Sequence, residues 1–132
     1  MKTLNATSTA TLNKMVSMME EGYIKIDNTN SSFMPVSVEV VFENDKYMIV
    51  SVAHYYEQNS DLLADPEMCF IQLKGMCLFM PSYFKQDGFL GREQESVLFE
   101  DGIIKGIRTK MQADHTQFAN MWLRNIKNQQ NL

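Results

Sequence analysis

The segment KYMIVSVAHYY, residues 46–56, is the feature that most constrains the fold of this chain. Successive side chains of an extended strand point to opposite faces, and here both faces are apolar. One face would carry Met48, Val50 and Val52, and the other Tyr47, Ile49 and Ala53. A strand that is apolar on both faces lies inside a sheet and is covered on each side. We therefore expect this segment to be a central strand.

Further extended segments flank this strand and are separated by turn residues. In residues 36–43 apolar and polar side chains alternate, which predicts a half-buried strand before a turn at residues 44–45. Two more hairpins are expected, around residues 74–75 and 101–102. Pro81 has no N–H to donate, so it should end its strand or place that strand at a sheet edge.

Both ends of the chain have the periodicity of amphipathic helices, at residues 8–21 and near residues 110–128. The apolar faces would carry Leu12, Met15, Val16 and Met19 in the first helix, and Met111, His115, Phe118, Trp122 and Ile126 in the second. The chain has 132 residues, of which 45% are hydrophobic, which suits one packed domain over residues 1–132. The expected fold is α+β, an antiparallel β-meander of about five or six strands flanked by an N-terminal and a C-terminal helix.

The two cysteines, Cys69 and Cys77, flank the turn expected at residues 74–75. A two-residue turn there would place Cys69 opposite Met80 and Cys77 opposite Gln72, with the two sulfurs on opposite faces. A disulfide needs Cα atoms within about 7 Å and converging Cβ atoms. We therefore expect two unpaired, buried thiols, which is typical of a reducing compartment.

The net charge of −4 is unevenly distributed along the chain. Residues 1–102 carry a net charge of −8, and residues 103–132 carry +4. Such a bipolar chain could meet two partners or one polar partner, or its last helix could simply be solvated. Five cations in residues 103–132 are few for a nucleic-acid binder. No apolar run is long enough to span a bilayer and the N-terminus lacks a signal-peptide core, so we expect a cytoplasmic protein.

Residues 53–70, AHYYEQNSDLLADPEMCF, form a polar stretch whose side chains could catalyse a reaction or bind a metal ion. His54 is in phase with the apolar face of its strand, which is more typical of a hydrogen-bonded core histidine than of a ligand. After Gln58 the chain is expected to leave the sheet, turn at residues 59–60 and form an ordered loop. The next strand would begin at Asp65–Pro66, because proline restricts the preceding residue to extended geometry.

Side-chain oxygens occur at alternate positions in this stretch, at Glu57, Asn59, Asp61, Asp65 and Glu67. An EF-hand loop would require glycine and glutamate where this chain has Leu62 and Met68, so a calcium loop is not expected. A magnesium or manganese site formed by Asp61, Asp65 and Glu67 remains open as an alternative to no cofactor. The sequence contains no HExxH, CxxC, G-x-S-x-G, P-loop or GxGxxG motif.

The run HYYEQNSDLLADPEM, residues 54–68, resembles the hallmark of an uncharacterised family of small proteins encoded by bacteriophages, plasmids and conjugative elements. The family pattern reads HYYEQNGDL, two variable residues, then DPEM, and this chain departs from it only at Ser60, where the family has glycine. The resemblance extends to FMPVSVE, PSYFKQDGFLG and FANMWLRNIK. It implies the cytoplasm of a bacterium and a mobile element, but no activity.

Two classes of function remain open, together with a purely structural role for the hallmark. The first is a non-enzymatic protein that binds a host or element protein, for example a defence-system inhibitor, or that forms a homo-oligomer. Its candidate contact residues are Tyr55, Tyr56, Gln58, Asn59, Phe89, Leu90 and Trp122, with Met121 beside the last and an edge strand near Pro81. The alternative is a metal-dependent hydrolase, with Glu57 or Asp61 as the base and His54 or Tyr55 orienting the substrate.

Overall fold

The computed structural model describes residues 1–28 and 33–132, which form two helices and eight strands. In chain order these are α1 (Ala6–Ser17), β1 (Tyr23–Ile26), β2 (Val36–Glu43), β3 (Tyr47–Gln58), β4 (Asp61–Leu73), β5 (Met80–Gln86), β6 (Arg92–Glu95), β7 (Val97–Glu100), β8 (Ile103–Ile107) and α2 (Thr109–Gln129). Strands β1 to β6 form one antiparallel sheet in chain order, and β7 and β8 form a separate hairpin. The predicted α+β class, with a meander between two helices, is confirmed.

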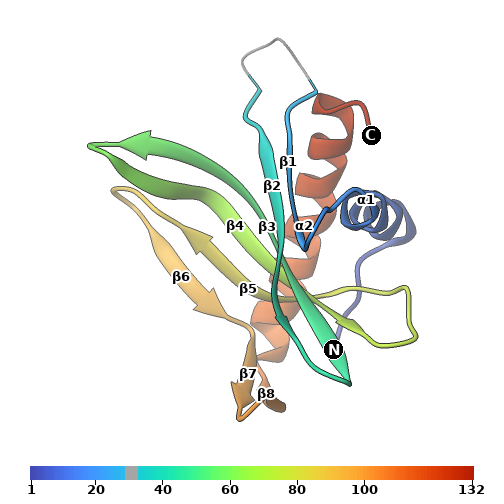
Figure 1. The fold of residues 1–132 in the computed structure, drawn as a ribbon. Helices are drawn as coiled ribbons and strands as arrows, with labels where there is room; N and C mark the ends of the chain where they lie inside the picture. The colour runs from blue at the N-terminus through green and yellow to red at the C-terminus, as the bar shows by residue number, and fades with distance from the viewer. Residues whose placement is uncertain (29–32) are drawn as a thin grey trace.

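Both helices pack against one face of the six-stranded sheet, and α2 runs along it (Figure 1). The buried side chains of the sheet and the helices form one core, which includes Leu12, Met15, Val36, Val38, Val50, Val52, Met68, Phe70, Phe84, Ala119, Leu123 and Ile126. Each large aliphatic or aromatic side chain buried in this way contributes about 1.5–3 kcal/mol. The helix-covered face is therefore the main source of stability.

The helix expected at residues 8–21 is shorter in the structure, where α1 spans Ala6–Ser17. Asn5 caps its start, because its side-chain oxygen accepts a hydrogen bond from the Ser8 backbone N–H at 2.8 Å. Glu21 and Gly22 then adopt positive φ angles of 54° and 78°, which turn the chain into β1. The C-terminal helix matches the range predicted for it.

Strand β3 lies inside the sheet as predicted, but it is covered on both faces over only part of its length. Tyr47 and Ile49 face away from the helices and pack with Val97 of the β7–β8 hairpin. Farther along the same side, Tyr55 lines a hollow in the surface. We call this side, opposite the helices, the open face of the sheet.

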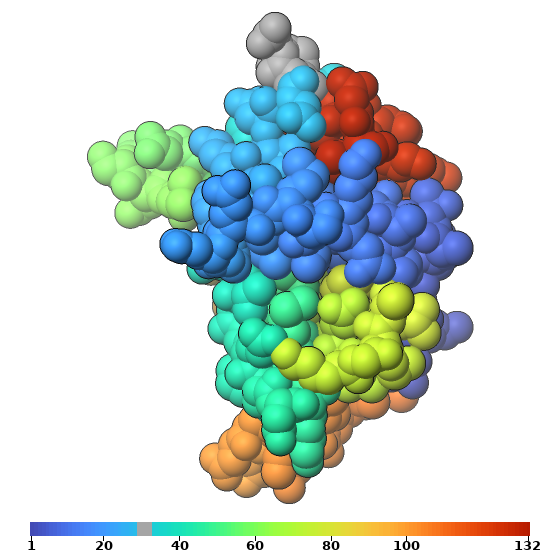
Figure 2. Space-filling model, turned by 45° about the vertical axis from the view of Figure 1, so that its right-hand side comes forward, coloured from blue at the N-terminus to red at the C-terminus, as the bar shows by residue number. Residues whose placement is uncertain are grey.

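Strands β3 and β4 extend beyond the strands on either side of them. β2 pairs with β3 only as far as Ala53, and β5 pairs with β4 only from Glu67. Residues 55–64 continue to pair with each other, and we call this hairpin end the arm. The arm projects from the body of the protein at the left of Figures 1 and 2.

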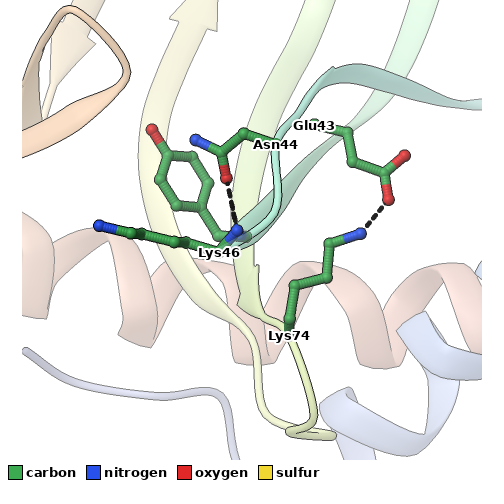
Figure 3. Close-up of polar contacts among 5 residues, drawn as sticks. Glu43, Asn44, Lys46 and Lys74 are labelled. Carbon is green, nitrogen blue, oxygen red and sulfur yellow. Dashed lines mark hydrogen bonds and ion pairs between the residues drawn. The ribbon is translucent and has the colours of Figure 1, made fainter.

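The turn predicted at residues 44–45 is confirmed at the junction of β2 and β3. The Asn44 side-chain oxygen accepts hydrogen bonds from the backbone N–H groups of Lys46 and Tyr47, each at 2.9 Å (Figure 3). Beside it, Lys74 from the end of β4 forms an ion pair with Glu43 (Figure 3). These contacts hold two neighbouring connections of the sheet together.

The prediction of a tight hairpin at residues 74–75 is wrong. Strand β5 begins only at Met80, which pairs with Ile71, so residues 74–79 form a wider connection. Its apolar residues mimic a strand in the sequence, but Phe79 is instead fully buried in the core beside the helices. The prediction for Pro81 is also wrong, because β5 lies between β4 and β6 and the sheet edges are β1 and β6.

The short edge strands β1 and β6 were not predicted from the sequence. In β6 the residues are Arg-Glu-Gln-Glu, which show no apolar alternation. Its pairing is visible only once β5 is in place, since Gln94 lies opposite Phe84. Short, charged edge strands are a common protection against unwanted strand pairing.

Two glutamines of the C-terminal region are buried, although the sequence pattern places them among polar residues. Gln112 accepts a hydrogen bond from the Lys2 N–H at 2.9 Å and donates to the carbonyls of Lys2 and Pro81 at 2.7 and 3.3 Å. Gln130 donates to the Met34 carbonyl at 3.1 Å and accepts from the Asn28 N–H at 2.8 Å. Both side chains tie α2 to distant parts of the chain.

Replacing Gln112 by leucine should lower the free energy of unfolding by about 1–2 kcal/mol, because the volume is kept while the backbone partners lose their hydrogen bonds. Urea denaturation measures the change. Gln117→Leu, an exposed position on the same helix, is the matched control and should stay within about 0.5 kcal/mol of the wild type. Equal effects of the two substitutions would contradict the role assigned to Gln112.

Candidate functional site

The hallmark stretch, residues 54–68, lies in a continuous hairpin. The prediction of a loop after Gln58 is therefore wrong. Asp61 begins β4 directly, and the pairs Gln58–Asp61 and Tyr56–Leu63 continue the ladder to the tip. Only Asn59 and Ser60 lie outside the strands, with φ angles of 54° and 70°. Positive φ at both central residues is the signature of a type I′ turn, whose twist matches that of a hairpin.

A bulge marks the root of the arm. Ala53 pairs with Glu67 and Tyr55 with Ala64, so Asp65 and Pro66 together lie opposite His54. The Asp65–Pro66 peptide bond is cis. Asp65 lies within β4 rather than at its start, and its carboxylate accepts a hydrogen bond from the Gln86 side chain at 2.7 Å.

His54 is a buried residue on the helix-covered side of the sheet. Its Nδ1 donates a hydrogen bond to the Pro35 carbonyl oxygen at 2.9 Å, and its ring meets the Trp122 indole edge-to-face at 5.6 Å. These contacts agree with the prediction of a hydrogen-bonded core histidine. Trp122 is only 6% exposed, so its proposed role as a surface contact is corrected to a packing role. Met121 beside it is exposed.

The structure does not bring the proposed catalytic and metal-binding side chains together. Glu57 and Asp61 are exposed near the tip of the arm. Glu67 lies on the open face, where its carboxylate accepts a hydrogen bond from the Ser51 hydroxyl at 2.5 Å, whereas His54 lies on the helix side. Among residues 1–28 and 33–132 there is no group of three His, Cys, Asp or Glu side chains placed to hold a metal ion.

A hollow of about 480 Å³ opens on the open face where the arm leaves the sheet. Tyr55 and Leu62 line it from the arm, and Tyr23, Lys25 and Glu39 line it from β1 and β2. Burial, and then the charge of the nearby Glu67, raise the pKa of Tyr55 to about 12. The phenol therefore stays protonated at neutral pH and can donate a hydrogen bond.

The cysteines form no disulfide, as predicted, but the expected register is wrong, and so is the expected burial of Cys77. Cys69 lies on β4 opposite Tyr83 and is partly buried, whereas Cys77 is exposed in the connection between β4 and β5. Burial, followed by the Glu67 carboxylate, raises the pKa of the Cys69 thiol to about 12. A thiol with this pKa is protonated at neutral pH and is a poor nucleophile.

The connection between β5 and β6 carries the most exposed apolar side chains of the described residues. Phe89 is 100% exposed and Leu90 is 85% exposed, and these two candidate contact residues form the tip of the connection. This tip is held against the root of the arm, because the Asp87 carboxylate accepts from the Ala64 N–H at 2.8 Å and the Asp87 N–H donates to the Ala64 carbonyl at 3.0 Å. Both tips point to the same side of the molecule in Figure 1.

We call the candidate contact residues of the arm and of this tip, which are exposed or half-buried, the arm surface. It consists of Tyr55, Tyr56, Gln58, Asn59, Leu62, Phe89 and Leu90. The surroundings of its arm part are acidic, with Glu57 and Asp61 on the arm and Glu39 in the hollow, whereas Lys85 and Arg92 lie beside the β5–β6 tip. Arg124 and Lys127, which belong to the positively charged C-terminal part of the chain, are exposed on α2 and not on the arm surface.

Within the described chain, neither helix has the length and apolar character needed to cross a membrane.

A family model described as Domain of unknown function (DUF6908) matches residues 7–132. The chain therefore belongs to this family, and the prediction of an uncharacterised family is confirmed at that level. No curated protein and no solved structure matches the chain.

Replacing Ser60 by glycine should raise the free energy of unfolding by about 0.5–1 kcal/mol, because the φ angle of 70° is strained for any residue with a Cβ. Thermal or urea denaturation measures the gain. Ser60→Ala keeps the Cβ and should give no gain. A glycine variant that is no more stable than the alanine variant would show that the turn does not have this left-handed geometry.

Proposed function

We propose that this protein is a small non-enzymatic binding protein that docks on another protein through the arm surface. The observation that carries the proposal is the exposure of two adjacent apolar side chains, Phe89 at 100% and Leu90 at 85%, beside a projecting hairpin. Single exposed apolar residues are ordinary on protein surfaces. Two adjacent ones on a loop anchored to a second exposed element are typical of a contact that excludes water when a partner covers it.

The anchoring of the two tips supports the same proposal. Asp87 bonds both backbone groups of Ala64, so the β5–β6 tip is fixed to the arm by two hydrogen bonds. The Tyr56 hydroxyl also lies close to Gly88, 3.3 Å from the position that a Cβ would take there. A preorganised surface loses less conformational entropy on binding than a flexible loop does.

The charges around the arm surface indicate the chemistry of the partner. Glu39, Glu57 and Asp61 lie around the hollow and along the arm, with Lys25 as the basic residue of the hollow. A matching surface would have basic side chains opposite the arm and an apolar socket for Phe89.

The resemblance of residues 54–68 supports a setting for this role. It favours a bacteriophage, a plasmid or a conjugative element as the source and the bacterial cytoplasm as the location. In that setting the partner is a host protein or another product of the element, for example a component of a defence system that the protein inhibits.

Affinity capture with quantitative mass spectrometry tests the proposal, using lysates of several bacterial hosts and the products of the element itself. One protein should be recovered in stoichiometric amount. The double substitution Phe89→Ser and Leu90→Ser should weaken its binding by about 2 kcal/mol or more, because both anchors lose their apolar contact.

Met76→Ser is the matched control, since Met76 is an exposed apolar residue in a different connection. This variant should bind as the wild type does. Failure to recover any stoichiometric partner, or a partner that binds the tip variant and the control equally well, would contradict the proposed function.

A further inference from the structure

A second candidate site lies on the helix-covered side of the sheet, at its β6 edge. There a pocket of about 450 Å³ opens between β5, β6 and the first half of α2. Its apolar lining comes from Phe84, Met111 and Phe118, and Arg92 and Lys110 supply cations. This volume falls within the range of about 300–1,000 Å³ that is common for small-molecule sites.

The apolar lining is arranged as aromatic surfaces. Phe84 meets Phe118 edge-to-face with ring centroids 5.5 Å apart, and it is stacked with the His115 ring at 5.7 Å. The Arg92 guanidinium carbon lies 5.2 Å from the centre of the Phe84 ring. Aromatic rings and a guanidinium plane are surfaces on which a further flat ring can stack.

His115 adds a polar group whose hydrogen-bonding capacity is only half used. It lines the pocket, is 6% exposed, and donates from Nε2 to the Gln94 side-chain oxygen at 3.0 Å. Its Nδ1 is buried and has no partner within the described chain, which is unusual for a buried polar atom. Burial, and then the Arg92 charge, lower the pKa of His115, so the ring is neutral at pH 7.

The charges of the pocket differ from those of the protein as a whole. Arg92 and Lys110 outnumber the one carboxylate of the lining, Asp114, whereas the whole chain has a net charge of −4. The ion pair between Lys110 and Asp114 spans 3.4 Å and is largely exposed. Exposed pairs of this kind contribute little, so Lys110 remains available to an anion.

We infer that this pocket binds a flat aromatic anion, whose ring lies among Phe84, Phe118 and Met111 and whose carboxylate or phosphate meets Arg92 and Lys110. Arginine binds both kinds of anion through paired N–H donors. None of the residues that line this pocket belongs to the arm surface, so the inference does not rest on the proposed function.

Nuclear magnetic resonance titrations of the full chain test this inference with three probes: 2-naphthoate, adenosine 5′-monophosphate and the neutral 2-naphthylmethanol. The chain has only two histidines, so the His115 ring signals can be followed with His54 as a reference. At least one of the anions should shift the signals of His115, Phe84 and Phe118 saturably. The neutral probe should bind about tenfold more weakly or worse, and a bound anion should raise the pKa of His115.

Arg92→Gln should weaken binding of the anion by about tenfold, or about 1.4 kcal/mol. Arg124→Gln is the matched control on an exposed arginine outside the pocket and should leave binding unchanged. Both replaced side chains are exposed, so both variants should keep the wild-type melting temperature.

Binding of naphthoate alone would identify a carboxylate ligand, and binding of the nucleotide alone a phosphate ligand. Three results would overturn the inference: no shift with either anion, equally tight binding of the neutral probe, or equal binding by the two arginine variants.

Discussion

The packing of β3 and β4 beneath α1 and α2 is the interaction on which the rest of the structure depends. Val50, Val52, Met68 and Phe70 of these strands are fully buried on the helix side, where the hydrophobic contribution is largest. Because this part of the hairpin is held so firmly, its other end can extend past the strands that flank it, with hydrogen bonds from Asp87 to Ala64 at its root. His54, buried against α2, lies where the supported part ends and the arm begins.

The sheet is covered unevenly, and this gives the molecule surfaces of different character. The open face is acidic around Glu39 and Glu67, and it continues onto the arm. The helix side is apolar except at its β6 edge, where α2 leaves the pocket beside Arg92. These are the two places where we propose ligands, a protein partner on the arm surface and a flat aromatic anion in the pocket.

The helices and strands with a strong apolar periodicity could be predicted from the sequence. The prediction failed for segments whose structure depends on tertiary contacts. Strands β2 and β3, the hairpin at residues 101–102 and both helices follow from apolar periodicity. The arm was mistaken for a loop because Asn59 and Ser60 lack the glycine of the usual two-residue hairpin turn and because the strand after them is polar. The burial of Gln112 was not predicted, because its hydrogen-bond partner, the backbone of Lys2, is far away in the sequence.

The hallmark stretch forms an ordered hairpin, and the proposed docking depends on that order. The most direct test is to measure nuclear Overhauser effects between the two strands of the arm in solution. We expect strong backbone contacts for the pairs Tyr56–Leu63 and Gln58–Asp61, with extended-strand chemical shifts on both sides of the turn. Random-coil shifts over residues 55–64 without these contacts would contradict it.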